Sequence, residues 1–383
     1  MTDKTKGKAT YAARAGGGFD EASGGIVPPL QPSTTFVRNE DYDLHIAENS
    51  YGRDNNDQVR LAEQILCTLE GAQDSLLFST GMAAISSTIG VLKRGQTLIL
   101  QEGIYWGTTH WVRAFCKKRE VNLVEVDSSN QQELASAISN HKPDMVFVET
   151  PSNPWLKVTD VVAAGKLAKE AGAILVVDAT AATPCVMQPL ELGADLVVHS
   201  ATKAINGHSD VLAGLVSTSD KSSDIWQQIM ADRHAGGAIL SAHSAWMLIR
   251  GMRTLPLRVE RMCQNAIDLA NYLEGHDKIE AVWYPGLVSN PGHEIAKAQM
   301  NDGFGYLLSF LVKGGKQEAL TFCRHIEGIH RATSLGGTES LIEHRHTIEG
   351  ELTGVPENLI RLSVGIEDVA DLKSELDAAL QRI

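Results

Sequence analysis

A lysine flanked by hydroxyl side chains carries the clearest chemical signal in this sequence. Lys203 stands in the stretch Ser200-Ala-Thr-Lys, directly after the apolar run at residues 196–199. At the end of a buried strand, its amine could form a Schiff base with an aldehyde, and the hydroxyls of Ser200 and Thr202 could bind a phosphate group. Most single lysines are solvated surface residues, so this interpretation depends on the neighbouring motifs.

A carboxylate closes a second apolar run. Asp178 follows residues 174–177, and burying its charge is costly unless a cation faces it. A protonated pyridine nitrogen would be such a cation, and the ring could then accept electrons from a substrate carbanion. The alternative is an aspartate that only caps the following turn. Together, Lys203 and Asp178 indicate pyridoxal 5'-phosphate (PLP) as the cofactor.

Two further motifs could complete such a cofactor site. Ser79-Thr-Gly-Met follows an apolar run, so the backbone N–H groups of Gly81 and Met82 would lie at a helix N-terminus, where phosphate groups bind. Ser-Thr pairs also cap helices that bind nothing. Tyr105 follows another run and could place its ring on a flat cofactor, although an ordinary core or surface aromatic is an equal alternative.

The elements that must hold these residues alternate between short apolar runs and helical patterns. Apolar runs predict strands at 75–79, 97–101, 122–126, 145–149, 174–178 and 196–200. Helical spacing begins at Asp57, with Gly71 as the stop, and recurs at 161–171. Such strands separated by helices indicate a mostly parallel sheet covered on both faces, which binds ligands at the carboxyl ends of its strands.

The pattern divides the chain into three parts. Residues 1–45 carry prolines and no sustained period, which predicts an extended N-terminal arm of the kind that often reaches a neighbouring subunit. Residues 46–245 form the predicted cofactor-binding α/β domain. Residues 246–383 form a smaller α+β domain, because long helical patterns follow there and apolar alternation returns at 305–312 and 359–364.

Composition narrows the classes of partner and compartment. The net charge of −13 argues against nucleic acid and anionic membranes, so small molecules are the expected ligands. The five cysteines are widely spaced, which favours a reducing cytoplasm over disulfides or zinc. No apolar run reaches the ~18 residues of a membrane helix. His344 and His346 lack further clear ligands and are interpreted as a polar loop, so no metal is assigned.

Nine segments follow one another in the order and approximate spacing of a known enzyme family. They are Tyr51-Gly-Arg53, FSTGMAAI, GIYWGT, ETPSNP, VVDATAATP, HSATKAINGHSDVLAG, RGMRTLPLR, SLGGTESLIEH and LIRLSVGIED. On these motifs the chain resembles the Cys/Met-metabolism family of PLP-dependent enzymes, which includes cystathionine synthases, cystathionine lyases and homoserine-ester sulfhydrylases. The resemblance covers nearly the whole chain and implies an α/β architecture of the aspartate-aminotransferase-like kind (fold type I).

The resemblance also implies how the cofactor would be held. Lys203 would be the Schiff-base lysine and proton shuttle, Tyr105 the ring-stacking aromatic and second catalytic residue, and Asp178 the partner of the ring nitrogen. The other cofactor-binding residues would be Ser79, Gly81, Met82, Thr180, Ser200 and Thr202, joined by Tyr51 and Arg53 of the partner subunit. Such a shared site implies a homodimer at least, and the family is usually a homotetramer.

The substrate side follows from the same resemblance. Arg361, with Ser334 and Asn153, would bind the α-carboxylate of an amino-acid substrate, because an arginine fork suits that planar anion. Thr333 would line the pocket for the distal part of the substrate. It stands where cystathionine-handling members often carry an acidic residue, which weakens cystathionine as the preferred ligand.

Other positions also depart from the family's pattern. Ala179 and Ala181 replace the common Asn and Phe next to the cofactor. Gly107 stands where methionine-degrading lyases have a cysteine, and Leu335 where one group of cystathionine β-lyases has a tryptophan. The segment after Glu343 lacks the family's common Met-Thr-His ending.

The leading hypothesis is γ-replacement of the cystathionine γ-synthase kind, which joins an activated homoserine ester to a thiol such as cysteine. The close alternative is a cystathionine γ- or β-lyase, which breaks a carbon–sulfur bond. A different class would be a catalytically silent PLP-binding protein, against which the intact Lys203, Asp178 and Arg361 argue. A fourth hypothesis, an α/β domain with an unrelated phosphate ligand, requires the order of the motifs to be accidental.

Overall fold

The computed structural model describes residues 7–17 and 19–383, apart from the side chain of Leu352. Its backbone groups into two compact units, Met1–Val91 with Asp195–Pro256, and Leu92–Ala194 with Leu257–Ile383. The chain therefore leaves the first unit after Val91 and returns to it at Asp195. We predicted domain borders at residues 45 and 245 from the pattern of the sequence. These borders differ from the borders of the two units, and they remain a prediction.

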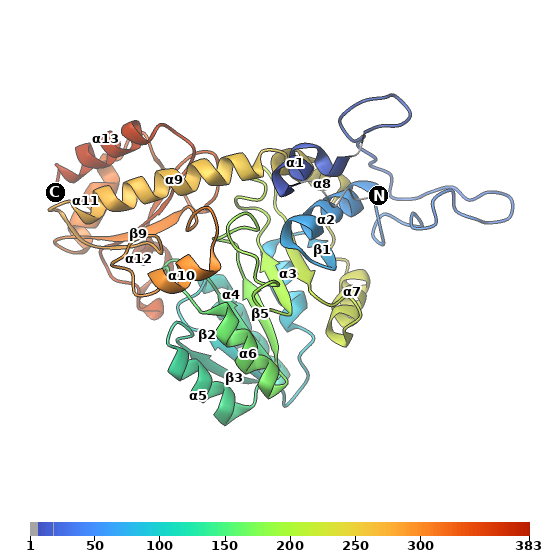
Figure 1. Ribbon diagram of the computed structural model, residues 1–383, viewed down its shortest axis with the longest axis horizontal. Helices are drawn as coiled ribbons and strands as arrows, with labels where there is room; N and C mark the ends of the chain where they lie inside the picture. Colours follow the sequence, from blue (N-terminus) through green and yellow to red (C-terminus); the bar gives the residue numbers. More distant parts are fainter. Residues whose placement is uncertain (1–6, 18) are drawn as a thin grey trace. The chain divides into compact units, whose positions relative to one another are not determined.

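The first unit is built on three antiparallel strands. Strand β7 (Gly214–Thr218) lies between β1 (Asp74–Phe78) and β6 (Leu196–His199). Around them the unit has α1 (Lys8–Ala13), η1 (Ala15–Gly17), α2 (Asp57–Glu70), α3 (Gly81–Ile89), α7 (Asp224–Gly236) and α8 (Ala242–Met252) (Figure 1). Helix α2 confirms the predicted pattern, because it begins at Asp57 and ends at Glu70, and the following Gly71, with a φ of 68°, turns the chain out of the helix.

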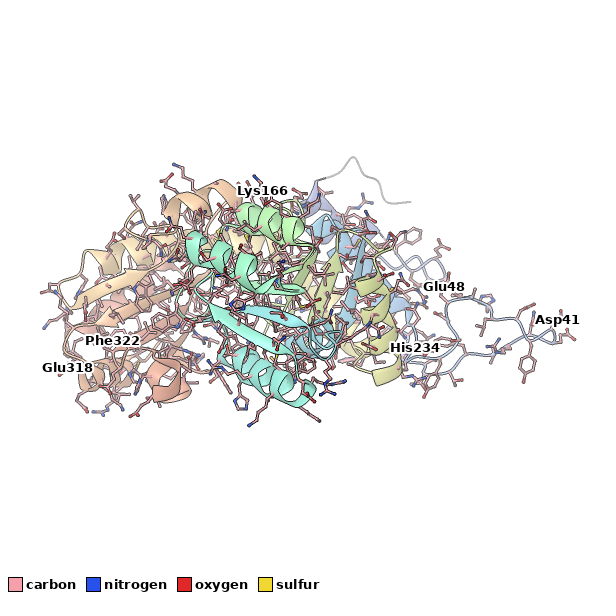
Figure 2. All side chains as sticks on the ribbon, turned by 90° about the horizontal axis from the view of Figure 1, so that it is seen from below. Asp41, Glu48, Lys166, His234, Glu318 and Phe322 are labelled. Atoms are coloured by element: carbon pink, nitrogen blue, oxygen red, sulfur yellow. The ribbon has the colours of Figure 1, made fainter. Side chains whose placement is uncertain are left out.

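Residues 19–56 of the first unit form a long loop with no helix and only isolated backbone bridges. Thr35 pairs with Tyr51, and Arg38 pairs with Leu44, so the segment folds back on itself. Asp41 lies at its outer end (Figure 2). Exposed large apolar side chains gather on this loop: Phe19, Ile26, Val27, Leu30, Val37, Tyr42, Ile46 and Tyr51. The predicted N-terminal arm, residues 1–45, also contains helix α1, which precedes this irregular segment.

The second unit contains the predicted parallel strands. Their order is β5-β4-β2-β3, with β2 (Thr97–Gln101), β3 (Asn122–Val126), β4 (Met145–Glu149) and β5 (Ile174–Asp178) all parallel. Helices α5 (Gln131–His141) and α6 (Val161–Ala171) cover one face, and α4 (Trp106–Arg119) covers the other (Figures 1 and 2). Every residue of β4 is buried, as expected for a strand covered on both faces.

A second sheet in the same unit has the order β10-β11-β12-β9-β8. Its strands are β8 (Ile279–Trp283), β9 (Leu307–Val312), β10 (His330–Arg331), β11 (Leu341–His344) and β12 (Leu359–Ser363). Helices α11 (Lys316–His325), α13 (Val369–Leu380) and most of α9 (Leu255–Glu274) share a core with this sheet, in which Phe310 meets Phe322 edge to face at 5.7 Å. The remaining elements are α10 (His293–Gln299), α12 (Arg345–Glu349) and η2 (Glu351–Thr353). Across the described ranges, no helix is long and apolar enough to cross a membrane.

Candidate active site

The first unit forms a cradle between the start of α3 and the turn after β6. Thr80 caps the helix, and its hydroxyl accepts a hydrogen bond from Ala83 N at 3.0 Å. Gly81 lies so close to Ser200 that a Cβ added at residue 81 would stand 2.7 Å from the Cβ of Ser200. Because a helix N-terminus presents free N–H groups to an anion, this close approach fits a phosphate group held by Gly81, Met82 and Ser200. Ser79 and Met82 are both partly exposed at the same turn.

Lys203 lies on the turn that follows β6, not within the strand. Its backbone N–H donates to Ser200 O at 3.1 Å, and its carbonyl accepts from Gly207 N at 2.8 Å, so the turn is held on both sides. The side chain of Lys203 is half-buried. Thr202 is engaged with Ala213, because its hydroxyl donates to Ala213 O at 3.1 Å and accepts from Ala213 N at 2.9 Å. To donate to a phosphate, that hydroxyl would have to leave Ala213.

A buried polar pair lies directly before this turn, and the sequence analysis missed it. His199, the last residue of β6, has its Nε2 2.6 Å from Oε1 of Glu70, the last residue of α2. Both side chains are completely buried. The pair therefore links the end of α2 to the strand that leads to Lys203.

Tyr51 and Arg53 lie together on the exposed loop of the first unit. The guanidinium of Arg53 stands over the ring of Tyr51, with 5.7 Å between Cζ and the ring centroid. Tyr51 is 47% exposed, which leaves its hydroxyl open to a partner. The predicted role of both residues in the active site of another subunit remains a prediction.

In the second unit, Asp178 ends β5 and receives two hydrogen bonds from one neighbour. The backbone N–H of Thr180 donates to Oδ1 of Asp178 at 3.0 Å, and the Thr180 hydroxyl donates to the same oxygen at 2.6 Å. Asp178 is 6% exposed. Donors on a buried carboxylate favour its charged form, which is the form that would hold a protonated ring nitrogen. Thr180, which we predicted to contact the cofactor, orients Asp178.

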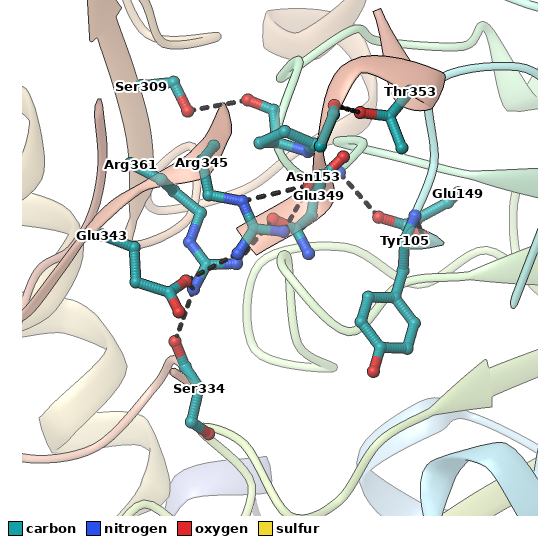
Figure 3. Close-up of polar contacts among 12 residues, drawn as sticks. Tyr105, Glu149, Asn153, Ser309, Ser334, Glu343, Arg345, Glu349, Thr353 and Arg361 are labelled. Atoms are coloured by element: carbon teal, nitrogen blue, oxygen red, sulfur yellow. Dashed lines mark hydrogen bonds and ion pairs between the residues drawn. The ribbon is translucent and has the colours of Figure 1, made fainter. Parts of the chain in front are cut away.

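Glu149 joins Tyr105 to Asn153, and the sequence analysis missed this residue as well. Its Oε2 accepts from Tyr105 N at 3.0 Å, and its Oε1 accepts from Asn153 N at 2.7 Å (Figure 3). Burial raises the pKa of Glu149 well above its usual value near 4.5, and Asp178 raises it further. Glu149 follows a buried strand just as Asp178 does, so the same signal was present in the sequence.

The ring of Tyr105 depends on the small residue at position 107. A Cβ added at Gly107 would lie 2.6 Å from Cε1 of Tyr105, which is too close for the ring to keep its place. Tyr105 is 37% exposed, and burial of the rest raises the pKa of its phenol. The ring of Tyr105 can therefore keep this position only while residue 107 is glycine.

Arg361 projects from the middle of β12 into a set of polar groups. Its Nη1 donates to Asn153 Oδ1 at 2.9 Å, and its Nη2 donates to Ser334 O at 2.8 Å and to Glu343 (Figure 3). The side chain is 3% exposed. Within the part of the chain that is described, its Nε has no hydrogen-bond partner. The structure thus brings Arg361, Asn153 and Ser334 together, and their role in binding a substrate carboxylate remains a prediction.

Ser334 reaches Arg361 through its backbone instead of its hydroxyl. Its φ is 114°, a region in which residues other than glycine are strained. The neighbouring Thr333 is exposed and uncharged. The carbonyl that accepts from Arg361 therefore belongs to a residue with an unusual backbone conformation.

Two more residues of this cluster were missed by the sequence analysis. Glu343 lies opposite Arg361 in the β11–β12 pairing, and Arg345 donates to Glu343 Oε2 at 2.6 Å. The neighbouring His344 contacts Thr347 Oγ1 and Glu357 O, both at 2.6 Å, and burial lowers its pKa. His346 Nδ1 lies 3.2 Å from Val355 O.

Comparison with known proteins places the whole chain in one group. A family model described as "Cys/Met metabolism PLP-dependent enzyme" matches residues 9–381. A cystathionine γ-synthase of Mycobacterium leprae is 39% identical, covering 98% of this chain and 97% of the relative. A cystathionine γ-lyase of Dictyostelium discoideum is 36% identical, covering 97% of each. A crystal structure of cystathionine γ-synthase from Xanthomonas oryzae pv. oryzae, in complex with aminoacrylate and cysteine, has a TM-score of 0.93 at 37% identity, covering 98% of both chains.

Proposed function

The chain belongs to the Cys/Met-metabolism family of PLP-dependent enzymes, and from this premise we propose that it catalyses γ-replacement, joining an activated homoserine ester to a thiol such as cysteine. The predicted fold type I is confirmed by the cystathionine synthase that matches the structure over nearly its full length. PLP is the cofactor, and the reaction is either γ-replacement or cleavage of a carbon–sulfur bond.

One observation carries the choice of γ-replacement. Thr333 places an uncharged, exposed side chain directly before Ser334, whose carbonyl holds Arg361. The ester group of an activated homoserine carries no ammonium group and suits an uncharged Thr333, whereas cystathionine bound as the starting substrate brings a distal ammonium group that an acidic residue at this position would bind. The γ-synthases of Mycobacterium leprae and Xanthomonas oryzae are consistent with the proposal.

We assign the binding of the substrate's α-carboxylate to Arg361. A carboxylate would accept a hydrogen bond from its Nε–H, which finds no acceptor among the residues described here. Asn153 and Ser334 hold the guanidinium in place before the substrate arrives, so little ordering is needed on binding. The amino group of the substrate would then face the cofactor.

When bound, PLP supplies an electron-accepting ring that stabilises the charge left when a substrate loses its α-proton. Lys203 would hold the resting cofactor through its amine and then carry the α-proton. Asp178, kept charged by Thr180, would keep the ring nitrogen protonated. Gly81, Met82 and Ser200 would bind the phosphate at the N-terminus of α3. Tyr105 would lie against the ring.

A carbon–sulfur lyase is the second candidate, since the 36% identical relative is named cystathionine γ-lyase. It would use Lys203, Asp178 and Arg361 in the same way until the leaving group departs. Cleavage of methionine is disfavoured, because position 107 carries glycine where methionine-degrading lyases have a cysteine. A silent PLP-binding protein would need no ordered arginine for a substrate carboxylate, so the contacts of Asn153 and Ser334 with Arg361 support an active enzyme.

We further propose that the active protein is at least a homodimer, with the tetramer as the expected form, and that it works in the cytoplasm. The exposed apolar side chains of residues 19–51 support this, because such side chains favour burial against another chain. Tyr51 and Arg53 would then reach the phosphate site of the partner. The five cysteines are all free, which suits a reducing compartment.

The test is to identify products from purified protein, PLP and O-succinylhomoserine or O-acetylhomoserine, with and without cysteine. Cystathionine that appears only with cysteine, measured by mass spectrometry, supports γ-replacement. A parallel reaction with cystathionine alone tests the lyase, whose products are an oxo acid and ammonia. If the protein with PLP shows no imine absorbance band, and Lys203→Ala gives the same products as the parent, the assignment of Lys203 is wrong.

A further inference from the structure

A second buried arginine stands next to the proposed carboxylate site. Arg345 is 2% exposed and opens α12, two residues after Glu343 of β11. Its Nη1 donates to Glu343 Oε2 at 2.6 Å, and its Nε donates to Glu349 Oε1 at 3.1 Å (Figure 3). Its Nη2 also contacts Glu349. All three nitrogens of the guanidinium therefore contact glutamates.

Glu343 is shared between the two arginines. Its Oε2 accepts from Arg345 and also from Arg361, which faces it across the β11–β12 pair. Its other oxygen, Oε1, has no hydrogen-bond partner among the described residues. A carboxylate that belonged to Arg361 alone would compete with any substrate carboxylate for the same guanidinium.

The charges of the cluster balance only because Arg345 is present. Arg361 and Arg345 are cationic, and Glu343 and Glu349 are anionic, so the four groups sum to zero before a substrate binds. Without Arg345 the sum would be −1, and a substrate carboxylate would make it −2 in a buried site, where like charges repel strongly. The pKa of Arg361 is lowered to about 10, chiefly by burial and then by Arg345, while Glu343 and Glu349 raise it, so all three neighbours act on the same guanidinium.

We propose that Arg345 is a positioning residue for substrate binding, because it offsets Glu343 and Glu349 and leaves the charge of Arg361 available to the α-carboxylate of an amino acid. This inference rests on the proposed function, in which Arg361 binds that carboxylate. Substitution of Arg345 should therefore weaken the binding of amines that carry a carboxylate and leave the binding of other amines unchanged.

The experiment compares two ligands that differ only in the carboxylate. L-Norvaline and n-butylamine are titrated into the PLP-loaded enzyme, and binding is followed by the change in the imine absorbance band. In Arg345→Met we expect the dissociation constant of norvaline to rise at least about tenfold, while that of butylamine stays within about twofold. Arg345→Lys keeps the charge but loses the fork of the guanidinium, so it should bind norvaline more tightly than Arg345→Met does and leave butylamine unchanged.

A charge-balanced double variant shows whether a loss of binding in Arg345→Met comes from the charge or from misfolding. Arg345→Met/Glu343→Gln removes one cation and the anion that pairs with Arg361, so the cluster again sums to zero and no carboxylate competes for Arg361; norvaline should bind within about threefold of the parent. If this double variant shows the parent's imine band and butylamine affinity but loses norvaline tenfold, the proposal is wrong. It is also wrong if Arg345→Met binds norvaline as tightly as the parent does.

The variant Arg361→Gln separates this inference from the proposed function. If it binds norvaline as well as the parent does, the carboxylate assignment itself fails. If Arg361→Gln loses norvaline while Arg345→Met does not, only the role of Arg345 fails.

Discussion

At the scale of single residues, the polar side chains of the second unit hold one another in place. Glu149 accepts from the backbones of Tyr105 and Asn153, and the Asn153 side chain accepts from Arg361. Each link fixes a group that we assign to the cofactor or to the substrate. Such preorganisation reduces the cost of ordering side chains when a ligand binds.

Thr180 offers a direct test of how Asp178 is oriented. Thr180→Val keeps the shape of the side chain but removes the hydroxyl that donates to Asp178 at 2.6 Å. Because a hydrogen bond to a charged group is lost, we expect the dissociation constant of PLP to rise about tenfold or more. Thr180→Ser keeps the hydroxyl and is the matched control. Equal PLP affinity of the Val and Ser variants, measured by absorbance titration, would argue against this role.

Glu63 should make the stability of the first unit depend on pH. Its Oε1 accepts from Leu77 N at 2.8 Å and from Arg233 at 2.9 Å, and burial raises its pKa to about 7 although Arg233 lowers it. The folded state therefore binds this proton more tightly than the unfolded chain does, so stability is lost as pH rises from about 4.5 to about 7. Glu63→Gln cannot titrate.

We expect the free energy of unfolding of Glu63→Gln, relative to the parent, to improve by up to about 3 kcal/mol between pH 4.5 and 8. Urea unfolding at several pH values measures this difference. A difference that stays constant across the range would show that Glu63 titrates normally.

At the scale of elements, helix α3 and the turn after β6 meet at a position where only glycine fits. In Gly81→Ala the new Cβ would stand 2.7 Å from the Cβ of Ser200, so the cradle would have to open. We expect PLP affinity to fall at least about tenfold, because the N–H groups at the helix N-terminus would move away from the phosphate. The control is Gly236→Ala near the end of α7, where no atom lies within 4 Å of an added Cβ. If both variants bind PLP alike, the cradle does not hold the phosphate.

The elements that the sequence predicted well are those with one unbroken apolar run. The strand over 145–149 is an example, since all its residues are buried and its pattern has no polar interruption before Glu149. Strand β8 was missed because it alternates, with Glu280 exposed, and β10 has only two residues, both exposed. The antiparallel pairing of β7 depends on which strands become neighbours, and local pattern does not encode that.

Residues of the site could be predicted from the sequence only where the type of a single residue and its place at a strand were informative by themselves. Lys203, Asp178 and Arg361 each stand at a strand or strand end that the sequence marks. Arg345 and Glu343 look like charges of a polar segment, and only the pairing of β11 with β12 reveals that they are buried against Arg361. The backbone role of Ser334 has no sequence signal, because its φ of 114° is unusual for a serine.

At the scale of the whole molecule, the exposed loop of the first unit suggests that one chain is not a complete enzyme. Arg53 and Lys203 would serve different active sites if the loop reaches a partner. Mixing Arg53→Ala with Lys203→Ala under conditions that exchange subunits should then recover about a quarter of the parent activity, because half of the dimers would be hybrids with one intact site. No recovery in a mixture shown to contain hybrids would place Arg53 in its own chain's site.

The most direct test of γ-replacement is one ratio measured on the same preparation. The numerator is kcat/KM for forming cystathionine from the better homoserine ester with saturating cysteine, and the denominator is kcat/KM for cleaving cystathionine. We expect a ratio well above one, because the homoserine ester needs no partner for a distal ammonium group, whereas cystathionine bound as substrate finds no acidic residue at Thr333. A ratio below one would make the chain a carbon–sulfur lyase and contradict the proposed function.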